Sequence, residues 1–207
     1  PFMAMKSGLS VRTKKKAYLT YFQHIENLAY ENQVTFIELR IPPLSNYCSK
    51  DSQVFNPLIK YSFTNIPVLT QIIDLKQSED ILWNNISKGH KANIKVANKI
   101  YKINYWDSSN LSKKTFYKYK NLHEQAMGRK VRSNKSFEMF FNWVIKGYAI
   151  LLEASLDEIS IGYVYIIIYK KRAYYASGCR DNNKLYQSPS HLLIWESMKY
   201  LKKNNVE

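Results

Sequence analysis

Three apolar stretches with very short connections constrain the fold of this chain most strongly. They run from Tyr148 to Ser155, from Ile159 to Tyr169 and from Arg172 to Ser177. Stretches this rich in Ile, Val, Leu and Tyr are typical of strands, and they are too long to stay exposed. Their connections are too short for the crossover that a parallel pair requires. The sequence therefore predicts three consecutive antiparallel neighbours, although the first turn lacks the glycine that hairpins favour.

Helices and further strands are predicted around this set. Apolar residues recur at the three- and four-residue spacing of amphipathic helices, and Ser78 is a good N-cap for one of them. A hairpin set flanked by helices is an α+β arrangement, in which helices cover a mostly antiparallel sheet. The predicted helices are Val11–Glu31, Glu79–Lys99, Leu111–Met127, Ser136–Lys146 and His191–Lys203, and the other predicted strands are Val34–Ile41, Phe55–Phe63, Val68–Leu75 and Tyr101–Trp106.

The net charge is strongly positive. The chain carries 31 basic and 16 acidic residues, a formal charge of +15, and only six of the basic residues are Arg. An AT-rich genome would explain the preference for Lys but not the shortage of Asp and Glu. Such an excess attracts anionic partners, so tRNA, a nucleotide-linked sugar, a lipid phosphate and an anionic membrane surface are all admissible.

A row of lysines follows one side of the predicted helix 79–99. Lys88, Lys91, Lys95 and Lys99 are spaced by three or four residues, which places them on one helical face. Lys91 and Lys95 are candidates for contacts to a phosphate backbone or a pyrophosphate. A solvated helix face is the alternative explanation.

Several kinds of site are not indicated. Cys48 and Cys179 lie far apart without a CxxC motif, which argues against a zinc site or a disulfide scaffold and favours a reducing, cytoplasmic environment. No run reaches the roughly 20 apolar residues that span a bilayer. A P-loop, a dinucleotide fingerprint and a nucleophile triad are also missing, so no metal and no tightly bound cofactor are expected. Because the chain begins at Pro1 and stops soon after Lys203, we expect a fragment of a longer protein.

Five stretches of the sequence together carry a family resemblance: Asp74–Trp83, Ser87–Ala97, Leu122–Ser133, Ala173–Gly178 and Ser188–Lys202. They resemble the FemAB-like branch of the GNAT acyltransferase superfamily, which includes lipid II:glycine glycyltransferase-like proteins. The resemblance implies a GNAT-like fold, the acyl-CoA N-acyltransferase fold, with a mostly antiparallel mixed sheet in a tandem arrangement. Residues 1–106 would form a partial first GNAT-like unit with the basic helix 79–99, and residues 107–207 a second GNAT-like domain that is incomplete at its C-terminus.

The resemblance also implies a function. It indicates transfer of an acyl or aminoacyl group to an amine of a peptidoglycan or amino-sugar polysaccharide precursor, with aminoacyl-tRNA or acyl-CoA as the donor. The expected partners are an anionic nucleotide- or lipid-linked precursor, tRNA and a peripheral membrane surface, but not DNA. GNAT enzymes that use acetyl-CoA hold its pyrophosphate with a glycine-rich loop at a helix N-terminus. The corresponding segment, Arg180–Ser190, has no glycine, which favours a different donor or a modified mode of phosphate binding.

Candidate substrate-binding residues lie at the end of the predicted helix Leu111–Met127. Gly128 permits a left-handed C-terminal cap, and His123 lies in the last turns. Arg129 and Arg132, with Ser133, have the donors to clamp a phosphate or a carboxylate through paired hydrogen bonds. Neutralisation of the helix dipole and surface solvation are the alternative.

The candidate catalytic residues lie on the last strand and the last helix. Tyr175, with Ser177 nearby, would place a phenol beside a reacting amine. His191, just after the candidate binding residue Ser190, and Glu196 would deprotonate the acceptor ammonium, because acyl transfer needs a neutral amine. Their five-residue separation puts His191 and Glu196 on different faces of one helix, so they cannot easily touch. Core packing is the structural alternative for each residue.

A GNAT-like layout of helices and strands brings several loops together at the mouth of one cleft. We expect Arg129 and Arg132, the end of the strand at Gly178 and the start of the helix at His191 to meet there. Two alternative functions remain open at this point. One is a non-catalytic basic module that binds RNA or a membrane surface, and the other is a CoA-dependent acetyltransferase that acts on an amino sugar.

Overall fold

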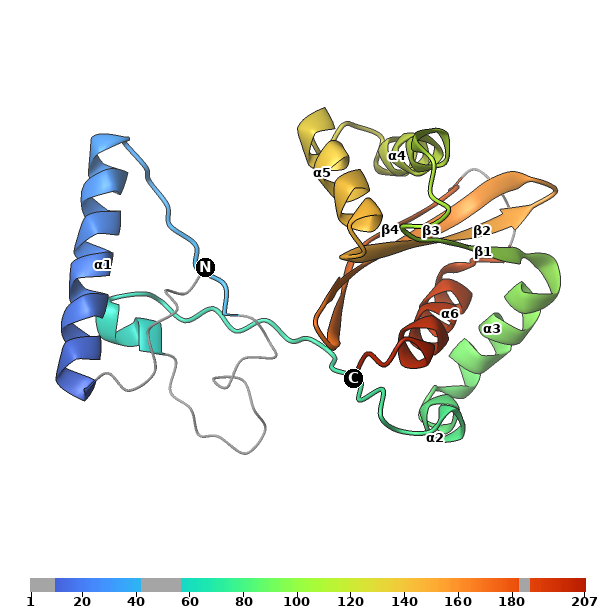
Figure 1. Ribbon diagram of the computed structural model, residues 1–207, viewed down its shortest axis with the longest axis horizontal. Helices are drawn as coiled ribbons and strands as arrows, with labels where there is room; N and C mark the ends of the chain where they lie inside the picture. The colour runs from blue at the N-terminus through green and yellow to red at the C-terminus, as the bar shows by residue number, and fades with distance from the viewer. Residues whose placement is uncertain (1–9, 42–56, 183–186) are drawn as a thin grey trace. The chain divides into compact units, whose positions relative to one another are not determined.

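The chain divides into two compact units, Pro1–Ile72 and Ile73–Glu207. The computed structural model describes residues 10–41, 57–182 and 187–207 (Figure 1). The second unit contains the sheet and all the candidate site residues.

A four-stranded sheet forms the centre of the second unit. Its strands are β1 (Lys102–Trp106), β2 (Ala149–Leu156), β3 (Ile159–Tyr169) and β4 (Arg172–Arg180), in the spatial order β1-β2-β3-β4. All three pairings are antiparallel. The predicted set of three consecutive antiparallel neighbours is therefore confirmed, and β4 extends three residues beyond the predicted end at Ser177.

Helices cover both faces of this sheet (Figure 1). On one face lie α3 (Lys88–Ile100) and α6 (Ser190–Lys203), and on the other lie α4 (Lys113–Met127) and α5 (Asn134–Ile145). Along β2, Ile150 and Leu152 pack with α3 and α6, whereas Ala149 and Leu151 pack with α4 and α5. Because β2 is buried on both faces, its sequence is continuously apolar instead of alternating.

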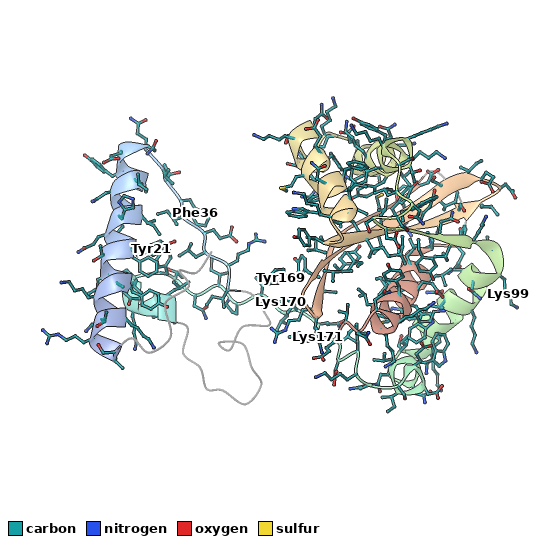
Figure 2. The ribbon with its side chains drawn as sticks, viewed as in Figure 1. Tyr21, Phe36, Lys99, Tyr169, Lys170 and Lys171 are labelled. Carbon is teal, nitrogen blue, oxygen red and sulfur yellow. The ribbon has the colours of Figure 1, made fainter. Side chains whose placement is uncertain are left out.

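Short turns join the central strands. Asp157 and Glu158 connect β2 to β3 with φ angles of 48° and 61°, the left-handed conformation at both positions that a type I′ hairpin requires. The turn after β3 has Lys170 at φ 55°, and Figure 2 shows Tyr169, Lys170 and Lys171 at this end of the sheet. The predicted hairpins thus form without glycine, because the flanking strands are held by burial.

The predicted helix Glu79–Lys99 is two helices. The first, α2, spans Glu79–Asn84, and α3 begins at Lys88. Ser87 caps α3, because its side chain accepts a hydrogen bond from the amide of His90 at 3.4 Å. A serine in this position competes with helix continuation by binding the amides of a new first turn. The single-helix prediction is therefore wrong.

The first unit differs most from its prediction. Helix α1 (Val11–Glu31) is confirmed, but the described residues form none of the three predicted strands. Within the described part of the chain, residues 34–41 and 68–75 are not in strands. Pro57 begins a 3-10 helix, Pro57–Tyr61, because its missing N–H and fixed φ suit a first helical position. Residues 55 and 56 of the predicted second strand lie outside the described residues.

The segment 73–106 packs with the C-terminal part of the chain. Strand β1 pairs with β2, α3 packs on α6, and Lys202 on α6 donates to the carbonyl oxygens of Leu75 and Gln77 at 3.0 and 2.7 Å. The boundary between the two compact units lies after Ile72. The expected division into GNAT-like domains after Trp106 stays a prediction. A tandem arrangement of two GNAT-like units stays a prediction.

Substitutions at two glycines test how closely the start of α6 packs on β3. A Cβ on Gly162 of β3 would lie 2.9 Å from Cγ of Pro189 and 3.1 Å from the carbonyl oxygen of Cys179. We expect Gly162→Ala to lower the free energy of unfolding by about 1–3 kcal/mol through overpacking. A Cβ on Gly89 of α3 would meet no atom within 4 Å, so Gly89→Ala should raise the free energy of unfolding by about 0.5–1 kcal/mol. Urea unfolding of both variants measures the difference, and equal effects would contradict this packing.

Candidate functional site

Buried polar side chains gather between α4, α5 and β4. Tyr119 and His123 lie one turn apart on α4 and are 0% and 3% exposed. Ser177 of β4 is buried as well, and Arg132, from the connection between α4 and α5, is partly buried. The charge of Arg132 acts on both Tyr119 and His123. These four residues are called the polar cluster below.

Three atoms of the polar cluster have no hydrogen-bond partner among the described residues. They are the hydroxyl oxygen of Tyr119, Nδ1 of His123 and Nε of Arg132, and each is buried. The surrounding contacts are aromatic: the His123 ring centroid is 5.7 Å from that of Phe137, and the Arg132 guanidinium carbon is 5.1 Å from the Phe140 centroid. A buried polar atom without a partner costs about 1–3 kcal/mol. The polar cluster therefore has unused hydrogen-bonding capacity.

The electrostatics of the polar cluster leave one formal positive charge among its three unpaired groups. Burial raises the pKa of the Tyr119 phenol, which Ser177 and Arg132 offset in part. Burial also lowers the pKa of His123, and the Arg132 charge lowers it further. At neutral pH, Tyr119 is thus a neutral phenol, His123 a neutral imidazole, and Arg132 a cation.

Two other candidate binding residues near α4 lie outside this group. Gly128 ends α4 with φ 64°, the predicted left-handed cap, and the Arg129 that follows is exposed. Ser133 is the N-cap of α5, where its hydroxyl accepts from the amide of Ser136 at 3.2 Å. The structure therefore gives Ser133 a capping contact, and it brings Arg132, not Arg129, to the buried groups.

Tyr175 lies on the outer strand β4 and is 51% exposed. A Cβ on Gly178 would collide with its hydroxyl, so the phenol lies along the strand towards Gly178. Partial burial raises the pKa of Tyr175, and Cys179 raises it further. A phenol that is protonated at neutral pH can donate a hydrogen bond, and it cannot readily accept a proton from an ammonium group.

His191 and Glu196 lie on α6, which packs on the sheet face opposite α4 and α5. The His191 ring stacks on His90 of α3, with centroids 4.1 Å apart, and burial, with His90, lowers the pKa of His191. Glu196 accepts a hydrogen bond from the Tyr105 hydroxyl at 2.6 Å and pairs with Lys199 at 2.6 Å. The structure therefore does not bring these two residues to the polar cluster.

The candidate lysines of α3 differ in exposure. Lys91 is partly buried and donates from Nζ to the carbonyl oxygen of Asn84 at 3.2 Å, which ties α3 to α2. Lys95 is exposed. Figure 2 shows Lys99 pointing away from the body of the second unit. Lys95 and Lys99 are thus available to an external anion, whereas Lys91 also has a structural contact.

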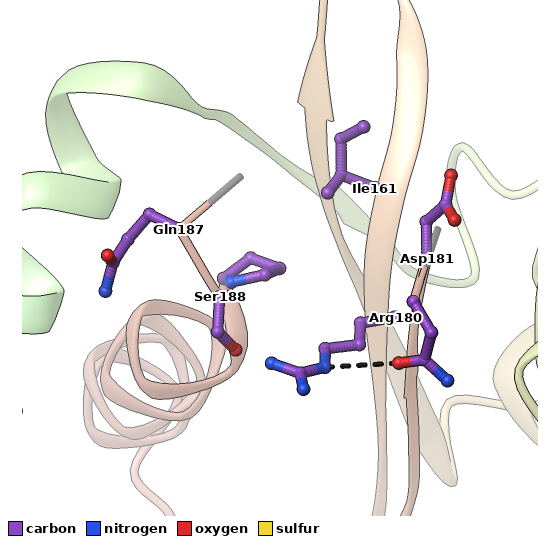
Figure 3. A pocket seen from close by; sticks show the side chains of 7 residues that line it. Ile161, Arg180, Asp181, Gln187 and Ser188 are labelled. Atoms are coloured by element: carbon purple, nitrogen blue, oxygen red, sulfur yellow. Dashed lines mark hydrogen bonds between the residues drawn. The ribbon is translucent and has the colours of Figure 1, made fainter. Parts of the chain in front are cut away.

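A cavity of about 110 Å³ lies where the end of β4 meets the start of α6. Figure 3 shows Arg180 extending from β4 towards Ser188, with its Nε donating to Oδ1 of Asn182 at 3.3 Å. No side chain caps the amino end of α6, and Ser190 at its start donates its amide to the Ser188 hydroxyl at 3.4 Å. The cavity thus combines a guanidinium with a helix N-terminus. Its lining residues are Ile161, Arg180, Asp181, Asn182, Gln187, Ser188 and Pro189.

The residues that line this cavity do not include Arg129, Arg132, Gly178 or His191, which were expected at one mouth, so the expected mouth stays a prediction. The end of β4 and the start of α6 meet at the cavity, and Asn182 donates to the carbonyl oxygen of Ala126 at 3.3 Å, which links the cavity to the end of α4. Arg180 itself was not among the residues that the sequence pattern singled out, although the segment from Arg180 to Ser190 was. The sequence feature that could have identified Arg180 is its position as a lone arginine between a strand and the start of a helix.

Glu153 and Tyr119 were also missed. Glu153 on β2 is 5% exposed, and its carboxylate accepts from Trp106 Nε1 at 2.8 Å, from the Tyr163 hydroxyl at 2.9 Å and from the Ser160 hydroxyl. A single carboxylate inside an apolar strand could have identified Glu153. No pattern separates Tyr119 from the other core aromatic residues of α4.

Metal clusters and membrane-spanning helices are absent from the described part of the chain. Within residues 10–41, 57–182 and 187–207, no three His, Cys, Asp or Glu side chains gather as they would around a metal ion. Across the same residues, no helix combines the length and the apolar character needed to cross a membrane.

Comparison with solved structures identifies the fold. FemX matches 64% of this chain at 14% sequence identity with a TM-score of 0.53. The match covers 49% of FemX, so this chain spans about half the length of that protein. The likeness confirms the predicted GNAT-like α+β fold. No protein-family model and no curated protein matches the sequence.

Two acetyltransferase structures match less closely. One is an aminoglycoside acetyltransferase from an uncultured soil metagenomic sample, in complex with sisomicin, with 17% identity, 53% of this chain and 75% of that chain covered, and a TM-score of 0.46. The other is the PaiA N-acetyltransferase of Thermoplasma acidophilum in complex with coenzyme A, with 15% identity, 51% and 75% covered, and a TM-score of 0.38.

The lowered pKa of His123 predicts a pH dependence of stability. In the unfolded chain, histidine titrates near pH 6.5, so as the pH falls below about 7 the unfolded state binds this proton before the folded state does. The free energy of unfolding should therefore fall with pH from about 7 until His123 protonates in the folded state, and then level off. Urea unfolding at pH 7.5 and 5.5 measures this loss.

Replacement of His123 isolates its contribution to the pH dependence of stability. Between pH 7.5 and 5.5, the free energy of unfolding should fall less in His123→Gln than in the wild type. The fall that remains includes the contribution of His191, whose pKa is also lowered. The exposed His24 of α1 provides the control, because His24→Gln should keep the full pH dependence. An unchanged dependence in His123→Gln would contradict the burial of a neutral imidazole.

Proposed function

We propose that this chain is part of an acyl- or aminoacyl-transferase that modifies an amine of an anionic cell-envelope precursor, such as a peptidoglycan or amino-sugar polysaccharide precursor. The GNAT-like fold supports the reaction class by analogy alone, because one fold can host many functions. The observation that carries the proposal is the cavity between β4 and α6, where Arg180 and the uncapped start of α6 come together.

The cavity has the chemistry to bind a donor phosphate. The amino end of a helix carries free N–H groups and a partial positive charge, and a guanidinium donates paired hydrogen bonds to phosphate oxygens. Together they replace the backbone amides of a glycine-rich loop, which the segment Arg180–Ser190 does not have. Both acyl-CoA and aminoacyl-tRNA carry phosphates, so either donor class fits this site.

The proposed reaction is a direct attack by the acceptor amine. Its nitrogen bonds to the carbonyl carbon of the donor, the carbon–sulfur or carbon–oxygen bond to the donor's carrier breaks, and the amine loses one proton. His191 is the favoured proton acceptor, because its imidazole is neutral and it follows the cavity residue Pro189 by two positions. Glu196 is engaged by Tyr105 and Lys199, which favours a role in holding α6 on β1.

The alternative function is a non-catalytic module that binds RNA or a membrane surface. The exposed Lys88, Lys95 and Lys99 on α3 favour it, because no acidic residue lies between Asp80 and Asp107. This alternative predicts binding to polyanions without any turnover of a donor.

A transfer assay with the full-length protein tests the proposal. Labelled acetyl-CoA or charged aminoacyl-tRNA is supplied with a nucleotide-linked amino sugar or a lipid-linked peptide as the acceptor. We expect one donor class to give labelled product, and Arg180→Gln to raise the KM for that donor by about 10-fold or more through loss of a charge-assisted hydrogen bond.

The control lies on the same strand. Arg172 is exposed at the opposite end of β4, so Arg172→Gln makes the same charge change away from the cavity and should leave the KM for the donor unchanged. Both variants should keep the wild-type Tm, because both side chains are exposed. Polyanion binding without transfer from either donor class would favour the non-catalytic alternative.

A further inference from the structure

We infer that the polar cluster is a binding site for a single carboxylate group, held by Tyr119, His123 and Arg132. As a statement about the substrate, the inference rests on the proposed function, since it adds that the acceptor or the transferred group carries a carboxylate. As a statement about binding, it stands on the geometry of the polar cluster alone.

The first argument is the contrast between Tyr119 and its neighbours. Tyr163 and Tyr165 are buried beside it, with ring centroids 5.6 and 6.1 Å from that of Tyr119. Both neighbours are satisfied: Tyr163 donates to Glu153 at 2.9 Å, and Tyr165 donates to the carbonyl oxygen of Phe140 at 2.8 Å. Tyr119 is 0% exposed. Ser177 lies near enough to lower the pKa of the Tyr119 phenol, but the hydroxyl makes no hydrogen bond of ordinary geometry among the described residues. The same core therefore pairs two phenols and leaves the third unpaired.

The second argument is that the unpaired atoms supply donors. The Tyr119 hydroxyl and Arg132 Nε carry hydrogens, and a neutral imidazole can place its proton on Nδ1 of His123. Each of the three lacks a partner among the described residues. A group that satisfies all three would accept several hydrogen bonds, which is the capacity of an oxyanion.

The third argument concerns charge. Arg132 supplies one formal positive charge, and His123 is neutral at pH 7. Glu124 on α4 lies near enough for its charge to raise the pKa of His123. It forms an ion pair with Lys120 at 3.8 Å, although its Oε1 is buried without a hydrogen-bond partner among the described residues. A carboxylate balances one positive charge, whereas a doubly charged phosphate would leave an uncompensated charge beside the aromatic rings of the core, which is costly.

The fourth argument is access. Arg132 is only partly buried, and residues 128–131 before it are exposed. Arg132 therefore forms the outer side of the polar cluster, while Tyr119 and His123 form its inner side. The inference therefore requires a carboxylate to reach the inner atoms from the side of Arg132.

Acetate is the probe for a direct test. The full-length protein is titrated with acetate, with acetamide and with inorganic phosphate at pH 7.5 and constant ionic strength, and the ring nitrogen signals of His123 are followed by NMR. We expect a saturable change with acetate and none with acetamide, which has a similar shape but no charge. An absence of saturable acetate binding, or phosphate binding as tight as that of acetate, would overturn the inference.

Paired tyrosine variants separate binding from packing. Tyr119→Phe removes an unpaired hydroxyl, so it should raise the Tm without ligand by about 2–8 °C and weaken acetate binding about 10-fold. Tyr165→Phe removes a paired hydroxyl, so it should lower the Tm and leave the acetate affinity unchanged. A lowered Tm in Tyr119→Phe would show that this hydroxyl has a structural partner, and the inference would fall.

The outcomes also separate this inference from the proposed function. Acetate binding that depends on Tyr119, in a protein without transfer activity, would support the carboxylate site and count against the transferase. Transfer activity without acetate binding would support the transferase and count against the carboxylate site. Arg132→Gln should abolish acetate binding in either case.

Discussion

The burial of β2 and β3 on both faces is the constraint on which the rest of the second unit depends. Strands without a polar face need a cover on each side, and the unit supplies two pairs of helices, α3 with α6 and α4 with α5. In this layered arrangement, the ends of the strands and helices lie at the edges of the sheet. Both candidate sites follow from it, since the cavity lies at a strand end and the polar cluster lies under the end of α4.

The buried polar groups of this unit divide into paired and unpaired sets. Glu153 accepts several hydrogen bonds, and Glu196 joins β1 to α6 through Tyr105. Those networks hold strands and helices in register, and a satisfied buried network specifies one packing. Among the described residues, the unpaired set holds the three groups of the polar cluster, together with Oε1 of Glu124 and Nδ1 of His191. The polar cluster gathers three of these unpaired groups in one place, which gives it a functional interpretation.

The sequence predicted the second unit well, because burial there leaves a strong pattern. Continuous apolar runs with two- or three-residue connections predicted β2, β3 and β4, and Gly128 predicted the end of α4. The first unit was predicted poorly, because Val34–Ile41 has the pattern of a strand but does not pair as one with any part of the chain that the structure describes. A strand depends on a partner elsewhere in the chain, whereas the break between α2 and α3 depends only on the local capping by Ser87. Tyr165 differs from Tyr119 because its hydroxyl donates to the carbonyl oxygen of Phe140, 25 residues away in the sequence. A local sequence pattern cannot predict such a contact.

The contacts of residues 202–207 have a consequence for synthesis. Lys202 holds the carbonyl oxygens of Leu75 and Gln77, and Glu207 pairs with Lys76 and Lys171 at 2.9 Å each. The first residues of the unit are thus fixed by its last ones. A ribosome makes the chain from its N-terminus, so the face of the sheet that α6 covers stays open until almost the whole unit has emerged. During that interval, apolar β2 and β3 depend on chaperones or on the speed of translation for protection from aggregation.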